Sequence, residues 1–177
     1  SPQFVWLGGG LRSVAHYCIV RTGSRNLCRK SFPADRGSCA MKRLEGKVAV
    51  VTGGGEGLGR ATCVRFAEEG AAVVVAEINP QTGRATAAAI KSSGGRALFV
   101  ETDVSNESSV EKMVEAAAAE FGKINVLVNN AAVFVLNGID ATVEEWRKIL
   151  DVNVMGCALV AKHVVPEMRK AGGGAIV

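Results

Sequence analysis

Short apolar runs alternate with longer segments of helical period from residue 41 onward. The runs have the length and composition of buried strands, and the segments between them place apolar residues three and four positions apart, as on one face of a helix. The expected strands are 48–51, 71–76, 96–100 and 125–128, with a fifth opening at 175–177, and the expected helices are 57–69, 80–92, 106–121 and 142–170. Because the strands are apolar on both faces and alternate with helices, the sequence predicts an α/β fold with a doubly wound parallel sheet of about five strands.

Capping residues mark the starts of two of these helices. Asn79 precedes Pro80, which is the order of an N-cap followed by proline at the first helical position. Thr142 is followed three residues later by Glu145, the spacing of a capping box. The last helix contains Pro166, where we expect a kink.

Residues 1–40 show no sustained period of a strand or of a helix, and their composition differs from that of the rest of the chain. They carry six basic side chains and one acid; the chain begins with Ser1, and its first methionine is Met41. An Arg-rich, Ser-rich and acid-poor composition is typical of an organellar transit peptide, and read-through sequence or a disordered tail is the competing interpretation. We expect a disordered tail over 1–40 and a folded domain over 41–177. The expected location is cytoplasmic, or mitochondrial or plastid if the tail is a transit peptide.

Composition excludes several classes of function. The chain has 177 residues, of which 48% are apolar and 21% charged, as in globular proteins. Residues 41–177 hold fifteen basic and sixteen acidic side chains, so the folded part has no basic surface for nucleic acid, and an RNA-binding role would rest on the charges of the tail alone. No uncharged stretch is both long and apolar enough to span a bilayer. We therefore expect neither a nucleic-acid partner nor a membrane.

The histidines and cysteines predict no metal centre. Two histidines are too few for most zinc sites, and five cysteines without a Cys-x-x-Cys pair argue against a disulfide framework and favour a reducing compartment. His163 and Glu167, four residues apart on one helix, are expected to form a surface pair. Cys63 and Cys157 are interpreted as small residues that pack between helices.

A glycine cluster joins the first strand to the first helix. The segment Thr52–Gly59 reads Thr-Gly-Gly-Gly-Glu-Gly-Leu-Gly, which lacks the Lys and Ser/Thr of a phosphate-binding P-loop and does not match Gly-x-Gly-x-x-Gly. It does match Thr-Gly-x-x-x-Gly-x-Gly. Glycines at this place let main-chain N–H groups approach a pyrophosphate at a helix N-terminus. A plain turn is the competing interpretation.

An acidic residue, Glu77, closes the second strand about 20 residues beyond the glycines. In a dinucleotide-binding fold an acid near this position accepts hydrogen bonds from the adenosine ribose. Its charge would also repel the 2′-phosphate of NADP, so Glu77 favours NAD and disfavours NADP. A solvated acid at a strand end is the competing interpretation.

Four motifs in order resemble those of the short-chain dehydrogenases/reductases. They are the loop Thr52–Gly59, the pair Asp103-Val104 after the third strand, Asn129-Asn130-Ala131 after the fourth, and Asn153 in the last helix. The usual glycine after Asn-Asn-Ala is replaced by Ala132. The resemblance spans residues 44–177 and implies a Rossmann-like fold, incomplete in this chain.

The resemblance also implies roles for single residues. Asp103 would accept a hydrogen bond from the adenine amino group beside the apolar wall of Val104; an Asp that only starts a loop is the alternative. Asn129 would tie neighbouring strands together, and Ala131 would let the cofactor ribose come close. Asn153 would hold a water in the catalytic proton relay, with a helix-packing hydrogen bond as the alternative. The residues implied in cofactor binding are Gly53, Gly55, Glu56, Gly57, Leu58, Gly59, Glu77, Asp103, Val104, Asn129 and Ala131, and the catalytic residue is Asn153.

The family's catalytic serine and its Tyr-x-x-x-Lys are not found after Met41. The chain has one tyrosine, Tyr17, which lies in the tail. The resemblance implies an NAD(H)-dependent oxidoreductase of alcohol or carbonyl substrates, present here as a fragment that is inactive by itself. A small-molecule substrate and a homo-oligomer are expected for the parent protein. A non-catalytic short isoform that binds nucleotide or partner subunits is the alternative.

Overall fold

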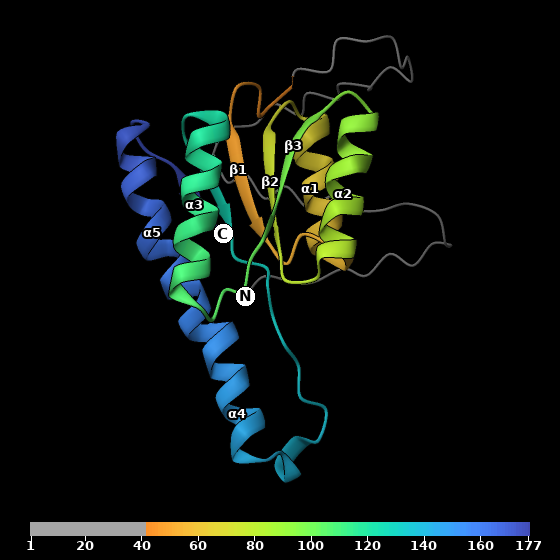
Figure 1. Cartoon of the computed structure of the whole chain (residues 1–177), viewed down its shortest axis with the longest axis vertical. Coiled ribbons are helices and arrows are strands. Elements are labelled where there is room, and N and C mark those ends of the chain that lie inside the picture. Colours follow the sequence, from red (N-terminus) through yellow and green to blue (C-terminus); the bar gives the residue numbers. More distant parts are fainter. Residues whose placement is uncertain (1–41) are drawn as a thin grey trace, which may run out of the picture. The chain divides into compact units, whose positions relative to one another are not determined.

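The computed structural model describes residues 42–177, which form an α/β fold (Figure 1). The predictions for the tail over 1–40 lie outside the described residues. In chain order the elements are β1 (Val48–Thr52), α1 (Gly57–Glu68), β2 (Ala72–Glu77), α2 (Pro80–Ser92), β3 (Arg96–Glu101), α3 (Glu107–Phe121), β4 (Val126–Val128), the 3₁₀ turn η1 (Gly138–Asp140), α4 (Val143–Leu150), the π-helical turn η2 (Asp151–Gly156), α5 (Cys157–Lys170) and β5 (Ala175–Ile176).

All the strands are parallel and run in the order β3-β2-β1-β4-β5. The chain moves outward in one direction from β1 to β3 and then returns to the other side of β1 with β4. This reversal creates a crevice at the carboxyl ends of the central strands, which is where open α/β sheets bind ligands. The five-stranded parallel sheet expected from the apolar runs is confirmed.

Each face of the sheet is covered by a pair of helices, α1 and α2 on one side and α3 and α5 on the other (Figure 1). Neighbouring residues of β1 alternate between the two cores: Val51 packs with Cys63 and Ile90, whereas Val50 packs with Met113 and Val164. All of these side chains are buried. Burial on both faces explains why the strands read as continuous apolar runs in the sequence.

The helix starts follow the capping residues of the sequence. The Asn79 side chain accepts a hydrogen bond from the Gln81 N–H at 3.0 Å, with Pro80 at the first helical position. Thr142 and Glu145 form a reciprocal capping box. Both caps are as predicted.

The segment from Val143 to Lys170 is helical throughout, as predicted, but its middle turn is π-helical. No sequence pattern indicated this turn. It places Gly156 directly on Val104, where a Cβ would come within 2.9 Å of the valine Cγ2. π-Turns inside helices are frequent at functional sites.

The helical segment Val143–Lys170 is also long and apolar. Among residues 42–177 it is long and apolar enough to cross a bilayer by length and composition alone, with a mean hydropathy of 1.4 over 18 residues. Because this helix contains charged side chains, it is not one of the uncharged stretches by which a span is expected from the sequence. A single helix of this kind is weak evidence for a membrane protein, and its residues Val160, Val164 and Met168 are buried in the core.

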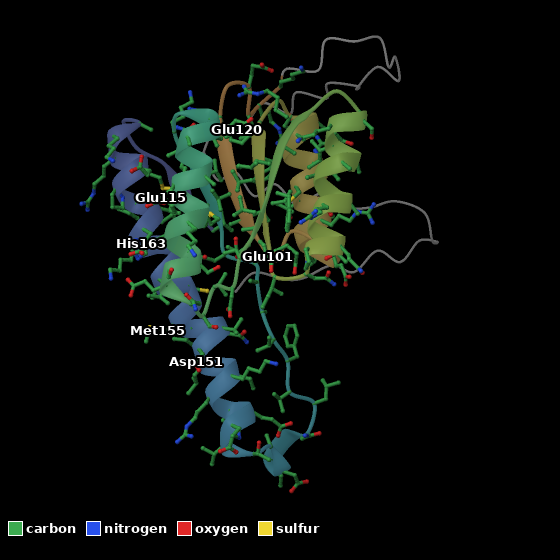
Figure 2. All side chains as sticks on the ribbon, viewed as in Figure 1. Glu101, Glu115, Glu120, Asp151, Met155 and His163 are labelled. Carbon is green, nitrogen blue, oxygen red and sulfur yellow. The ribbon has the colours of Figure 1, made fainter. Side chains whose placement is uncertain are left out.

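Large apolar side chains on the first half of this helix are exposed. They are Val143, Trp146, Leu150, Val154 and Met155. Figure 2 labels Met155 and Asp151 on the part of the helix that leads away from the sheet. The homo-oligomer expected from the resemblance stays a prediction.

A buried carboxylate at the end of α1 predicts how stability depends on pH. The Glu69 side chain, 11% exposed, accepts hydrogen bonds from the N–H and guanidinium of Arg43 at 3.1 and 3.0 Å and also pairs with Arg65. The Arg43 hydrogen bonds lower the pKa of Glu69 from 4.5 to about 2. Because the folded-state pKa is depressed, the contribution to stability is complete above pH 4.5 and is lost as the pH falls toward 2.

We expect Glu69→Gln to lower the free energy of unfolding near neutral pH, and the difference from wild type to shrink as the pH falls through this window. Urea denaturation at a series of pH values measures the difference. The matched control is Glu68→Gln, since Glu68 is exposed and pairs with Arg65 at 3.6 Å. If the difference in the free energy of unfolding between wild type and Glu69→Gln stays constant with pH, the lowered pKa of Glu69 is contradicted.

Candidate functional site

A cavity of about 950 Å³ lies at the carboxyl edge of the sheet. Its walls come from the segments that follow β1, β2, β3 and β4, and from one side of α4 and η2. The predicted site residues that line it are Gly53, Glu56, Leu58, Glu77, Asp103, Val104 and Ala131. The structure does not place Gly55, Gly57, Gly59, Asn129 or Asn153 on the wall.

The glycine loop packs too tightly for side chains at several of its positions, among them Gly53 and Gly59. A Cβ at Gly59 would overlap the carbonyl oxygen of Gly53. Gly53 has a φ of 64°, and a Cβ there would lie 2.9 Å from the Cα of Ala131. These two glycines therefore let the start of α1 and the segment after β4 close around the loop.

The N-terminus of α1 points its free N–H groups toward this region. Glu56 is the N-cap, in extended conformation, and its side chain makes no capping hydrogen bond. The first N–H groups of a helix have no partner within the helix. Together with the helix dipole, they favour an anion at this place.

Thr52 and Asn130 join the glycine loop to the segment after β4. The Thr52 hydroxyl accepts hydrogen bonds from the N–H groups of Asn130 and Ala131 at 3.0 and 3.1 Å. The Asn130 side-chain amide donates to the carbonyls of Thr52 and Gly53 at 3.0 and 3.1 Å. Ala131 is thereby held on the cavity wall.

The strand-tying role expected of Asn129 belongs to other asparagines. Its backbone N–H donates to the Val177 carbonyl at 2.8 Å, whereas the side chains that link strands are those of Asn130 and of Asn125, whose Oδ1 accepts from the Val48 N–H at 3.1 Å. The Asn129-Asn130 pair in the motif indicated that an asparagine at this place joins neighbouring strands. Which of the two amides turns inward depends on the strand register, and the motif does not reveal it.

Glu77 ends β2 with both carboxylate oxygens engaged by backbone N–H groups. Oε2 accepts from Gly55 at 2.9 Å and Oε1 from Asn79 at 3.1 Å. Each oxygen can accept a second hydrogen bond, and the side chain lines the cavity. The carboxylate is therefore fixed in place and still able to bind hydroxyl groups.

Asp103 and Val104 lie beyond the end of β3. One oxygen of Asp103 accepts from the N–H and the hydroxyl of Ser105 at 2.9 and 2.6 Å, so this residue does start the loop before α3. It also lines the cavity, where Oδ2 can accept from a ligand. Val104 is almost fully buried and packs against Gly156.

Asn153 lies in η2 and contacts the backbone of the segment after β4. Its Oδ1 accepts from the Val133 N–H and its Nδ2 donates to the Val133 carbonyl, both at 2.9 Å. Val133 lines the cavity, so the Asn153 side chain fixes one part of the wall without lying on it. The partner is a loop backbone and not a second helix.

The cysteines described by the structure offer no nucleophile at this site. Cys63 is fully buried beneath Gly54, and burial raises the pKa of its thiol to about 12. The thiol of Cys157, the first residue of α5, donates to the carbonyl of Asn153 in η2 at 3.3 Å.

The histidine pair expected on the last helix is not formed. His163 contacts Glu107 of α3 at 2.9 Å and Glu111 at 3.9 Å, whereas Glu167 pairs with Lys170 at 2.6 Å. Figure 2 shows His163 on α5, beside α3. Pairing across two helices cannot be read from a spacing within one.

Glu107, Glu111 and His163 offer potential metal ligands, with their ligand atoms within 4.8 Å of one another. The Lys162 ammonium lies 2.6 Å from the Glu107 carboxylate and lowers its pKa. We interpret the cluster as an ion-pair network that joins α3 to α5.

A family model and several known proteins match most of this chain. A family model described as short chain dehydrogenase matches residues 47–177. An uncharacterized oxidoreductase of Thermotoga maritima is 44% identical over 135 residues, which cover 76% of this chain and 53% of the relative. A cis-4-hydroxycyclohexanecarboxylate dehydrogenase of Sinomonas cyclohexanicum is 43% identical over 135 residues, with 74% and 53% covered.

A solved structure has the same fold. It is titled 7 alpha-hydroxysteroid dehydrogenase complexed with NADH and 7-oxo glycochenodeoxycholic acid; the TM-score is 0.73 at 34% identity, covering 77% of this chain and 53% of that one. The chain spans about half the length of the curated relatives it matches.

Proposed function

This chain belongs to the short-chain dehydrogenase family, and we propose that it is the NAD(H)-binding half of an oxidoreductase of alcohol or carbonyl substrates. The observation that carries the proposal is the cavity where the strand order reverses. The glycine loop beside this cavity is packed so closely that Gly53 and Gly59 have no room for a Cβ. A cradle that side chains would fill suits a ligand that must approach the backbone closely, as a pyrophosphate does.

The chemistry of the residues at this site supports a dinucleotide as the ligand. Glu77 and Asp103 provide acceptors for the ribose hydroxyls and the adenine amino group at one end, beside the apolar Val104. The N–H groups at the start of α1 would bind the pyrophosphate. The small side chain of Ala131 would leave space for the second ribose. Thr52 and Asn130 hold the Ala131 backbone in this position.

A bound NAD supplies the acceptor or donor of a hydride. The residues of this chain would bind and orient it, with its pyrophosphate at the helix N-terminus. Asn153, through its hydrogen bonds to Val133, fixes the wall where the nicotinamide end would lie. We assign it the water-holding role that the family resemblance implies.

The substrate proposed for the whole protein is a small molecule with a secondary alcohol on a ring. The names of the cyclohexanecarboxylate relative and of the hydroxysteroid neighbour carry such groups. We expect no turnover from the 177-residue chain itself, because its one tyrosine is Tyr17 and no tyrosine follows Met41.

Titration of the purified chain with NADH, followed by the fluorescence of the nicotinamide, tests the proposal. We expect saturable binding at one site per chain, reversed by NAD⁺. We also expect no change in NADH concentration when cyclopentanol and NAD⁺ are added. Absence of saturable binding would contradict the proposed cofactor site, and turnover would contradict the proposed inactivity of the chain.

A further inference from the structure

A buried threonine of α2, Thr86, contacts the glycine loop from the core side. Its side chain is fully buried, and its hydroxyl donates a hydrogen bond to the Gly55 carbonyl at 3.1 Å. Thr86 lies outside the cavity wall, and no sequence motif pointed to it.

Gly55 is held on both sides by side chains from other elements. Its N–H donates to Glu77 Oε2 at 2.9 Å, while its carbonyl accepts from Thr86. A Cβ at Gly55 would lie 2.8 Å from Glu77 Cγ and would overlap the Thr82 hydroxyl. The close fit explains why glycine is needed here although its φ is not in the left-handed region.

The contact with Thr86 fixes the direction of one peptide unit. No peptide bond among the described residues is cis. In a trans peptide the N–H points opposite to the carbonyl. Because the Gly55 carbonyl points to the buried Thr86, the N–H of Glu56 points the other way, toward the open side of the loop, where Glu56 lines the cavity.

We propose that Thr86 is a positioning residue that keeps the Gly55–Glu56 peptide turned with its N–H toward the pyrophosphate and its carbonyl away from it. The inference rests on the proposed function, since it requires an anionic ligand in the cavity. Without the hydroxyl, the Gly55 carbonyl would face buried apolar groups with no donor. Glycine permits the peptide to flip, and the flipped carbonyl would direct its negative end at the phosphates.

Thr86→Val keeps the shape of the side chain and removes the hydroxyl. We expect it to weaken NADH binding by about tenfold, which corresponds to the loss of one well-placed hydrogen bond. Thr86→Ser keeps the hydroxyl and is expected to bind NADH within about twofold of wild type. Ser92→Ala removes an exposed hydroxyl from the same helix and serves as the control.

A second ligand separates positioning from a general loss of structure. Adenosine lacks the pyrophosphate, so Thr86→Val should leave its binding nearly unchanged while NADH binding falls. A role in stability alone would lower the urea midpoint and leave the dissociation constant of NADH as in wild type. Thr86→Ala provides the same test if Thr86→Val does not fold.

The outcomes distinguish this inference from the proposed function. If the unmodified chain binds no NADH, the proposed function fails and the inference fails with it. If the unmodified chain binds NADH and Thr86→Val or Thr86→Ala binds it equally well, the inference alone is overturned. It is also overturned if adenosine and NADH lose affinity in equal proportion.

Discussion

Replacing Gly59 with alanine is expected to weaken NADH binding by roughly tenfold to a hundredfold. The new Cβ would overlap the Gly53 carbonyl oxygen and lie 2.6 Å from the Asn130 amide nitrogen. The loop and the start of α1 must then separate, which moves the N–H groups that face the pyrophosphate. Fluorescence titration with NADH measures the loss.

The sign of the effect on stability makes this prediction specific. Glycine to alanine within a helix ordinarily stabilises a protein by about 0.5–1 kcal/mol. At position 59 we expect destabilisation instead, because the methyl group meets backbone. Arg60→Ala is the control, since Arg60 is the exposed neighbour on the same helix. A Gly59→Ala chain that is more stable and binds NADH normally would show that the loop is not packed as described.

The choice between NADH and NADPH is expected to depend on Glu77. At about 4 Å and an effective dielectric near 20, a carboxylate and a phosphate charge repel by about 4 kcal/mol, and even a third of that is about tenfold in affinity. Glu77→Gln removes the charge but keeps an oxygen that can accept the Gly55 N–H. We expect NADPH affinity relative to NADH to rise by about tenfold or more.

Glu77→Ala removes the hydrogen bond to Gly55 as well as the charge. We expect the same shift toward NADPH, together with weaker binding of both cofactors, because Gly55 loses one of its two hydrogen bonds to side chains. The control is Glu101→Gln, which removes an equal charge from the residue paired with Glu77 on β3, outside the main cavity. An unchanged NADPH-to-NADH ratio in Glu77→Gln would remove this assignment.

The sheet and the helix caps could be predicted because each depends on residues close in sequence. Val48–Val51 and Ala72–Ala76 are buried on both faces, so their apolar runs reveal them directly. The capping box at Thr142 needs only the residue three positions later. The alternation of strands and helices indicated a parallel sheet, whereas the order of its strands comes from the structure.

Contacts between distant segments could not be predicted in the same way. The pairing of His163 with Glu107 joins residues 56 positions apart, and the contact of Thr86 with Gly55 joins residues 31 positions apart. Asn153 makes its hydrogen bonds to Val133 from a π-turn that no periodicity indicates. Each depends on how two elements pack, which a local pattern does not contain.

Several residues of the family motifs lie together at the carboxyl edge of the sheet. Glu77, Asp103 and Ala131 come from three separate strands and line one cavity. The motifs did not separate residues on the wall from those that hold the wall in place. Gly59 and Asn153 belong to the second group in this structure, as does Asn130, whose amide holds the loop although its residue also lines the cavity.

Hydrogen–deuterium exchange of the chain with and without NADH tests the central claim most directly. If the cofactor lies in the cavity, amide exchange should slow in residues 53–59 and at the carboxyl ends of β2, β3 and β4, while α5 stays unchanged. Protection confined to the exposed apolar side of the helix at Trp146 and Leu150, with none in residues 53–59, would contradict the assignment of this edge of the sheet as the cofactor site.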